Sequence, residues 1–281
     1  MYRLGLIGYP IQHSLSPWIH NHFLKRAQLQ GTYELIEISP HDSFEHAIQQ
    51  LKKRDLDGFN ITVPYKQHII PYLDEVDPAA KRVGAVNTVL LKDDKWIGYN
   101  TDGWGYVRSL KSKFPDLFAH NDRNILVLGA GGAARGIYDA VANEGFNRVD
   151  IANRTVTSAE DIAQLKLDHT KTNIMTLKDA EQTIGDYDAV IQTTSVGMSP
   201  DINDIIISLG NLQTGTIMSD IVYQPIETRF LKEAQTIGAP IHYGHTMLLY
   251  QAQYAFEIWT GKRVPIEQLE QALREQLMEG K

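Results

Sequence analysis

The sequence predicts an α/β protein of two domains, the second of which has a Rossmann-like, doubly wound fold. Two observations predict this class. A glycine-rich turn, GAGGAARG at 129–136, lies in the middle of the chain, between an apolar run at 125–128 and a helical pattern at 133–143. Before it, residues alternate between strand-like and helix-like patterns, which is typical of a mixed α/β sheet. With 281 residues, the chain is long enough for two separate cores.

The first domain is expected to contain strands at 2–7, 32–38 and 58–63 and helices at 17–29 and 43–53. A weaker helix follows, and then a hairpin of strands at 88–91 and 96–99 that turns across Asp93 and Asp94. Ser16 and Pro17 predict the start of the first helix, with Ser16 as its N-cap. A polar stretch at 113–124 is expected to be a loop near the domain junction.

The second domain is expected to contain strands at 125–128, 149–152, 188–192 and 216–221, with helices at 133–143 and 156–165. After Gly244 the pattern becomes helical at 246–259 and 265–277, and these helices are expected to return to the first domain. The predicted domains are therefore 1–103 with 244–281, and 104–243.

The glycine-rich turn has the features of a dinucleotide pyrophosphate site. Gly129 permits the turn, Gly131 allows the backbone to approach phosphates, and the following helix offers free N–H groups. The next strand is followed by Asn153, Arg154 and Thr155. An arginine there suits a 2′-phosphate, whereas NAD enzymes usually carry an acidic residue, so we expect NADP. The alternatives are a purely structural turn and a surface arginine.

Composition excludes several classes of protein. Hydrophobic residues make up 43% and charged residues 22%, as in ordinary globular proteins. The net charge of −7 without a basic block argues against a nucleic-acid partner. The chain has no cysteine, which excludes disulfides and thiolate catalysis, and its histidines show no metal-ligand spacing. Without a signal or membrane-spanning pattern, we expect a cytoplasmic protein, monomeric or homodimeric, that binds a small molecule but no metal.

Two polar clusters of the first domain lie where a ligand could reach them. Ser14 and Ser16 precede a helix N-terminus and could bind a carboxylate, although Ser16 could also act only as a cap. Asn60 and Thr62 would share one face of a short strand, and such polar residues are costly to bury without partners. Lys66 follows just after Pro64, where it is either part of the site or one of many surface lysines.

A third cluster combines Asn87, which opens a predicted strand, with Asp102, which closes one near the domain boundary. A carboxylate in this position could pair with Lys66 and face a nicotinamide ring. The alternative is an aspartate that caps a turn.

Several motifs together resemble the shikimate dehydrogenase family over essentially the whole chain. They are GYPIQHSLSPWIHN (8–21), DGFNITVPYK (57–66), GAVNT (84–88), NTDG (100–103), GAGGAARG (129–136), NRT (153–155), DIVYQP (220–225) and MLLYQA (247–252), in that family's order and spacing. The resemblance implies an enzyme that reversibly reduces 3-dehydroshikimate to shikimate with NADPH, in the pathway to aromatic amino acids. The first domain would then bind substrate and the second NADP.

The resemblance also implies roles for individual residues. Lys66 and Asp102 would form the catalytic pair. The substrate-binding residues would be Ser14, Ser16, Asn60, Thr62, Asn87, Asp102, Tyr223 and Gln251. The cofactor would contact Gly129, Ala130, Gly131, Gly132 and Ala133 at its pyrophosphate, Asn153, Arg154 and Thr155 at its adenosine phosphate, and Thr194, Val196, Gly244 and Met247 near its nicotinamide.

Two departures from the family pattern qualify these expectations. No further basic residue follows Thr155 closely, so the preference for NADP is expected to rest on Arg154 and Thr155. Tyr243 and His245 flank Gly244, where a triplet such as Asp-Gly-Leu is common. Alternative functions are a quinate/shikimate dehydrogenase that uses NAD, and an NADP-binding sensor without catalysis. The presence of both Lys66 and Asp102 argues against the sensor.

Overall fold

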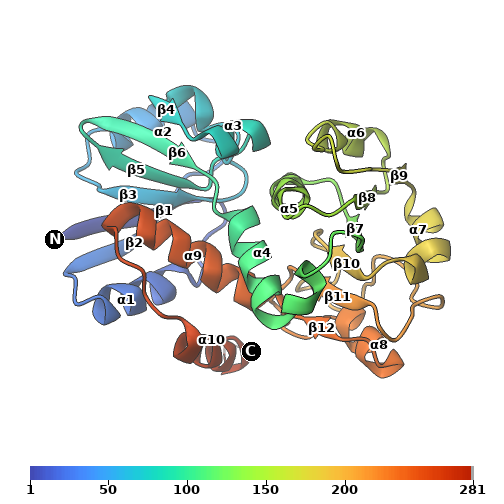
Figure 1. The fold of residues 1–281 in the computed structure, drawn as a ribbon. Coiled ribbons are helices and arrows are strands. Elements are labelled where there is room, and N and C mark those ends of the chain that lie inside the picture. Colours follow the sequence, from blue (N-terminus) through green and yellow to red (C-terminus); the bar gives the residue numbers. More distant parts are fainter. Residues whose placement is uncertain (280–281) are drawn as a thin grey trace. The chain divides into compact units, whose positions relative to one another are not determined.

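A computed structural model describes residues 1–279, which form two compact units (Figure 1). The first unit comprises Met1–Thr101 and Gln251–Ile266. The second comprises Asp102–Tyr250 and the described residues from Glu267 on. The C-terminal region was expected to return whole to the first domain, but the last helix groups with the second unit. There its Arg274 lies over the ring of Tyr243, 5.6 Å from the ring centroid.

The first unit is built on a six-stranded mixed sheet with the order β2-β1-β3-β5-β6-β4. β1, β2 and β3 are parallel, whereas β5 and β6 form the predicted antiparallel hairpin. The strands are β1 (Tyr2–Gly8), β2 (Gly31–Glu37), β3 (Gly58–Ile61), β4 (Glu75–Val76), β5 (Thr88–Lys92) and β6 (Lys95–Tyr99). The helices are α1 (Ser16–Arg26), α2 (Phe44–Leu51) and α3 (Pro78–Val83), with a 3₁₀ turn at Ile70–Tyr72.

Alternation along β1 distributes side chains to the two faces of this sheet, because successive strand residues point in opposite directions. Leu4 and Leu6 pack in a cluster with Trp259 of α9 (Gly244–Thr260). Ile7 lies in a different cluster, which contains Ile48 of α2. Helices therefore bury both faces of the sheet.

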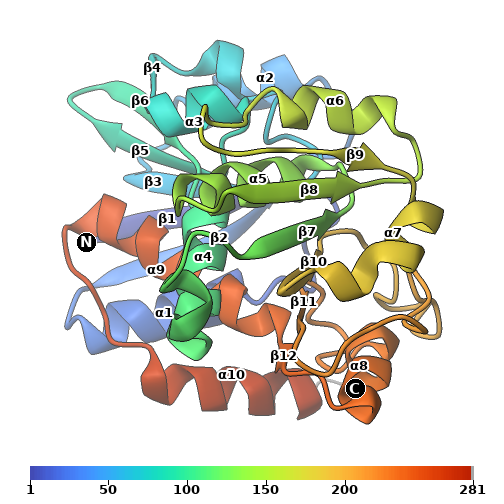
Figure 2. The same cartoon turned by 45° about the vertical axis from the view of Figure 1, so that its right-hand side comes forward.

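The second unit is a parallel sheet with the order β12-β11-β10-β7-β8-β9 (Figure 2). This is the strand order of a dinucleotide-binding Rossmann fold. The strands are β7 (Asn124–Leu128), β8 (Arg148–Ala152), β9 (Ile174–Met175), β10 (Ala189–Gln192), β11 (Ile217–Asp220) and β12 (Ile241–His242). The helices are α4 (Asp102–Lys113), α5 (Gly132–Asn143), α6 (Thr157–Ala163), α7 (Leu177–Thr183), α8 (Arg229–Ile237) and α10 (Glu267–Glu279), with 3₁₀ turns at Pro115–Phe118 and Ile184–Asp186.

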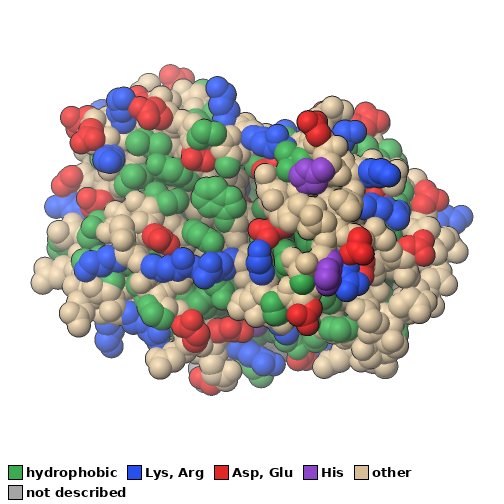
Figure 3. All heavy atoms as spheres, in the orientation of Figure 1, with side chains coloured by type: hydrophobic (Ala, Val, Ile, Leu, Met, Phe, Trp, Pro, Cys, Tyr) green, Lys and Arg blue, Asp and Glu red, His purple; other side chains and the backbone are tan. Residues whose placement is uncertain are grey.

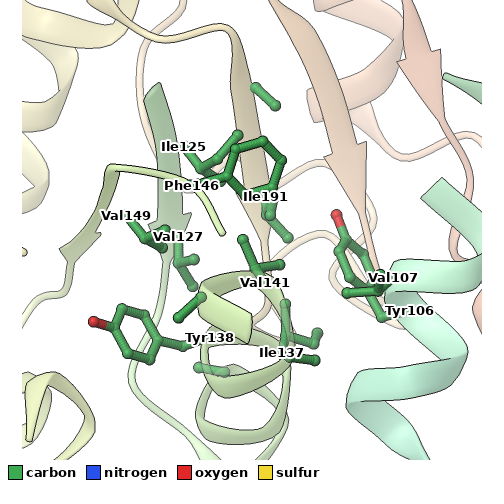
Figure 4. Close-up of a cluster of buried hydrophobic side chains, with 14 of the residues drawn as sticks. Tyr106, Val107, Ile125, Val127, Ile137, Tyr138, Val141, Phe146, Val149 and Ile191 are labelled. Carbon is green, nitrogen blue, oxygen red and sulfur yellow. The ribbon is translucent and has the colours of Figure 1, made fainter. Parts of the chain in front are cut away.

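The same alternation divides the core of the second unit in two. Ile125 and Val127 pack with Tyr106 of α4 and Ile137 of α5 on one face (Figure 4). Leu126 and its neighbours on the other face pack against side chains of α7 and α8. The apolar run at 125–128 is buried on both faces, as expected for a central parallel strand.

Several local predictions were wrong. Ser16 does not cap α1: it is the first helical residue, and its N–H donates to Ser14 Oγ at 3.2 Å. α1 also ends at Arg26, three residues earlier than expected. β3 ends at Ile61, so Thr62 lies beyond the strand that was expected to include it. Asp102 does not close a strand but begins α4. Within residues 1–279, no helix combines the length and apolarity needed to cross a membrane.

Candidate active site

The glycine-rich turn joins β7 to α5 and leaves the start of that helix open. Gly129 has φ +112°, and a Cβ there would lie only 2.6 Å from Thr194 Cγ2, so the position requires glycine. Gly131 precedes the first helical residue and is exposed, and a Cβ on Gly131 or Gly132 would meet no atom within 4 Å. A phosphate could therefore approach the free N–H groups of α5 closely, which fits a dinucleotide pyrophosphate. Ala130 and Ala133 are half-buried beside them.

The segment after β8 lies at the same edge of the sheet as this turn. β7 and β8 are parallel neighbours, so their carboxyl ends meet there. Arg154 and Thr155 are exposed, and the side-chain amide of Asn153 donates to the carbonyl oxygen of Thr155 at 2.8 Å. An exposed guanidinium on a loop held in this way is available to a 2′-phosphate.

The segments after β10 and β11 complete this edge. Thr194, Val196 and Tyr223 are half-buried, and burial raises the pKa of the Tyr223 hydroxyl. Gly244 begins α9 directly against the backbone after β11, where a Cβ would lie 2.3 Å from the carbonyl oxygen of Ile221. Met247 is buried in the core cluster of α4 and α5.

In the first unit, the serine pair lies at the start of α1. Ser14 Oγ donates to Ser16 Oγ at 3.2 Å and accepts from the Ser16 N–H at the same distance. Ser14 is half-buried and Ser16 is buried. The two hydroxyls therefore lie together at a helix N-terminus, an arrangement suited to a carboxylate.

Asn60 is held by three neighbours. Its Oδ1 accepts from the hydroxyl of Tyr33 at 2.8 Å. Its Nδ2 donates to the carbonyl oxygen of Asn87 and to Oγ1 of Thr88, both at 3.1 Å. A buried amide with these bonds has a single orientation. Because its donors and one acceptor site are already used, Asn60 is arranged to orient its neighbours.

Asn87 continues this network toward Asp102. Its Oδ1 accepts from Thr88 Oγ1 and from the N–H of Thr101, each at 2.9 Å. Its Nδ2 donates to Thr101 Oγ1, also at 2.9 Å. Thr101 is fully buried and directly precedes Asp102, so the amide of Asn87 fixes the chain where α4 begins.

Sequence reasoning missed Tyr33 and His20. The ring of His20 stacks on that of Tyr33, with centroids 4.5 Å apart. Burial lowers the pKa of His20 to about 3, against an opposing contact with Asn60 that raises it, and His20 is therefore neutral near pH 7. Nothing near Tyr33 in the sequence signals this role, because its partner Asn60 is 27 residues away.

The remaining predicted site residues are distributed as follows. Thr62 and Lys66 are half-buried after β3, and the carbonyl oxygen of Lys66 accepts from the N–H of Val86 at 2.8 Å. Gln251 is half-buried in the part of α9 that belongs to the first unit. Asp102 is buried at the start of the second unit, so its pairing with Lys66 stays a prediction.

Surface charge and potential metal ligands are the remaining features of the structure that bear on a site. Acidic and basic side chains both occur across the face drawn in Figure 3. No group of three or more potential metal ligands occurs within the described part of the chain. An anion would therefore have to be bound by local donors, for which Ser14, Arg154 and the start of α5 are the candidates.

A parallel sheet in Rossmann order, with an open glycine turn at its carboxyl edge, defines the class of dinucleotide-binding proteins. Comparison with known proteins specifies the family. Residues 6–89 match the shikimate dehydrogenase substrate binding domain, 109–213 the shikimate / quinate 5-dehydrogenase family, and 244–274 the shikimate 5'-dehydrogenase C-terminal domain. The chain belongs to the shikimate dehydrogenase family.

Individual relatives agree over nearly the full length. The shikimate dehydrogenase (NADP(+)) of Oceanobacillus iheyensis is 53% identical over 278 residues, covering 99% of each chain. That of Staphylococcus aureus is 45% identical, covering 98% of each chain. The crystal structure of shikimate 5-dehydrogenase from Thermus thermophilus with NADP(H) and shikimate has a TM-score of 0.86 at 32% identity, covering 98% of this chain and 99% of that one.

Proposed function

We propose that this protein catalyses the reversible, NADPH-dependent reduction of 3-dehydroshikimate to shikimate. The observation that carries the proposal is the buried network of Asn60 and Asn87. It lies in the part of the first unit that matches the family's substrate binding domain and leads through Thr101 to the start of α4. The resemblance of 53% identity to an NADP-dependent shikimate dehydrogenase supports the same reaction.

The cofactor site would be the carboxyl edge of the second sheet. The pyrophosphate would lie at the exposed glycines Gly131 and Gly132, where the structure leaves open space at the start of α5. Arg154 and Thr155 would bind the adenosine 2′-phosphate. Thr194, Val196, Gly244 and Met247 would lie near the nicotinamide. The exposed arginine at the end of β8 supports NADP over NAD.

Most of the substrate-binding residues would come from the first unit. Ser14 and Ser16 would donate hydrogen bonds to the substrate's carboxylate, helped by Tyr223. Thr62, Asn87, Asp102 and Gln251 would bind its ring hydroxyls. Asn60 would act through Asn87, because its amide is already bonded to Tyr33, Asn87 and Thr88.

Lys66 and Asp102 would carry out the proton transfer. Bound NADPH supplies the hydride to the ring carbonyl carbon. As the carbonyl oxygen becomes an alkoxide, the Lys66 ammonium would stabilise the growing charge and deliver one proton to that oxygen. Asp102 would hold the ammonium beside the oxygen. In the reverse direction, neutral Lys66 would accept the proton of the substrate hydroxyl, so one hydride and one proton are transferred in each direction.

The proposal also covers location, oligomeric state and partners. We place the protein in the cytoplasm, as a monomer or homodimer without nucleic-acid or membrane partners. The absence of cysteine supports a reducing compartment, and the net charge of −7 argues against a nucleic-acid partner. Sedimentation of the purified chain would measure its oligomeric state.

An assay of nicotinamide absorbance with shikimate or quinate, each with NADP or NAD, tests the function. We expect the highest kcat/KM for shikimate with NADP. Higher kcat/KM for quinate with NAD would identify the oxidative alternative. No turnover with any pair, despite NADP binding, would identify a non-catalytic sensor.

A further inference from the structure

The segment that follows β10 is packed directly onto the glycine-rich turn. The hydroxyl of Thr193 donates to the carbonyl oxygen of Leu128 at 2.7 Å, and its N–H donates to the same oxygen at 2.9 Å. A Cβ on Gly129 would lie within 2.7 Å of both Thr193 and Thr194. The position of this segment and the shape of the glycine turn therefore depend on each other.

One side chain bonds to both ends of the segment 194–196. Gln192, the last residue of β10, is fully buried. Its Oε1 accepts from the N–H of Thr194, and its Nε2 donates to the carbonyl oxygen of Val196 at 3.0 Å. The amide of Gln192 thus sets the conformation of 194–196, which also has a bond from the Val196 N–H to Thr194 Oγ1 at 3.2 Å.

Asp220 fixes which way this amide faces. It lies opposite Gln192 in the pairing of β10 with β11 and is fully buried. Its Oδ1 accepts from Gln192 Nε2 at 3.3 Å and from the Val222 N–H at 2.9 Å, and its Oδ2 accepts from Thr228 Oγ1 at 2.7 Å. Because Oδ1 of Asp220 accepts from both donors, the NH₂ group of Gln192 faces it, which leaves Oε1 of Gln192 for the Thr194 N–H.

We propose that Gln192 and Asp220 are positioning residues for the nicotinamide end of the cofactor. The pair determines the positions of the segments after β10 and β11 relative to the glycine turn. Those segments contain Thr194, Val196 and Tyr223. This inference rests on the NADP site of the proposed function. Neither residue has to touch the cofactor, since each acts through the backbone it holds.

The proposal is tested by comparing the binding of NADPH with the binding of a fragment of the cofactor. Adenosine 2′,5′-bisphosphate has the adenosine phosphate of NADP but no nicotinamide. In Gln192→Met, which keeps the length of the side chain and removes its hydrogen bonds, we expect the Kd for NADPH to rise about tenfold. The Kd for the fragment should stay within about twofold of the wild-type value, because the end of β8 is unchanged.

A matched control separates positioning from general destabilisation. Thr216→Val removes the buried bond from Thr216 Oγ1 to the carbonyl oxygen of Tyr187, 2.8 Å long, at the amino end of β11. We expect it to lower the unfolding temperature and to leave the Kd for NADPH unchanged. If Thr216→Val weakens NADPH binding as much as Gln192→Met does, the positioning proposal is wrong.

A second variant covers the case in which Gln192→Met does not fold. Gln192→Asn keeps an amide beside Asp220 but is one methylene shorter, so it no longer reaches both the Thr194 N–H and the carbonyl oxygen of Val196, and the same selective loss of NADPH binding is expected. Equal weakening of NADPH and fragment, or no weakening of either, would overturn the proposal. The wild-type shikimate assay is judged separately: without turnover the proposed function fails, whereas the binding ratio still tests Gln192.

Discussion

The hydroxyl of Tyr33 donates a hydrogen bond of 2.8 Å to Oδ1 of Asn60, and both side chains are buried in the first unit. The bond joins β2 to β3 across the intervening strand β1. It determines which end of the Asn60 amide faces Asn87 and Thr88. A residue outside the predicted site thus orients two residues within it.

Tyr33→Phe should therefore affect both stability and substrate binding. It leaves a buried acceptor on Asn60 without this donor, which we expect to lower the free energy of unfolding by about 1–3 kcal/mol. The KM for shikimate should rise several-fold, because Asn87 is less firmly oriented. Denaturant unfolding and steady-state kinetics measure the two effects.

Tyr65→Phe is the matched control for that variant. Tyr65 is also buried in the first unit, and its hydroxyl donates to the carbonyl oxygen of Ile38 at 2.8 Å. We expect a similar loss of stability without a change in KM. A similar rise in KM for both variants would show that Tyr33 has no specific effect on the site.

Arg154→Ala should weaken NADP binding and leave NAD binding nearly unchanged. Loss of a hydrogen-bonded charge pair with the 2′-phosphate is expected to cost about 1.5–3 kcal/mol. Titration of both cofactors by calorimetry measures the difference. Arg229→Ala, which removes an arginine that pairs with Glu233 on α8, is the control. An equal loss for NADP and NAD would mean that Arg154 does not recognise the 2′-phosphate.

Lys66→Ala should lower turnover by about 10²–10⁴-fold, the usual contribution of one acid–base group. The KM for shikimate should change much less, because the ammonium is needed most when the carbonyl oxygen becomes an alkoxide. Lys53→Ala, at an exposed position, should leave both parameters unchanged. A raised KM with intact turnover would make Lys66 a substrate anchor and Asp102 the better candidate for proton transfer.

Buried histidines should make the protein sensitive to acid. Burial lowers the pKa of His20 to about 3, well below the value of about 6.5 for an unfolded chain. The unfolded state therefore binds more protons between these values, and the stability from this group, fully present above about pH 6.5, is lost as the pH falls. Burial lowers the pKa of His242 to about 3 and that of His245 to about 4, which adds to the effect.

His20→Phe tests the contribution of one group. Phenylalanine can keep the contacts with Tyr33, Phe23 and Trp259 and does not titrate. Between pH 6.5 and pH 4, we expect its unfolding free energy to fall less steeply than that of the wild type. An identical slope in both proteins would show that His20 does not contribute to acid sensitivity.

Long apolar runs and glycine turns were predicted well from local sequence. The strand at 125–128, the glycine turn that begins at Gly129 and the helix after it occur as expected, because burial on both faces and a positive φ both leave local signals. The expectation missed β4, β9 and β12, which have two residues each, and the helices α4, α7 and α8. Strands this short exist only because a neighbouring strand pairs with them.

The sequence by itself determined the fold class, the family and the NADP-type loop, since these depend on residue types at short, fixed spacings. Only the tertiary structure decided which buried polar residues form hydrogen bonds with one another. Tyr33 with Asn60, and Gln192 with Asp220, are 27 and 28 residues apart. Their bonds form because neighbouring or nearby strands bring them together in a core where a buried polar group must find a partner, and no local pattern records which partner it finds.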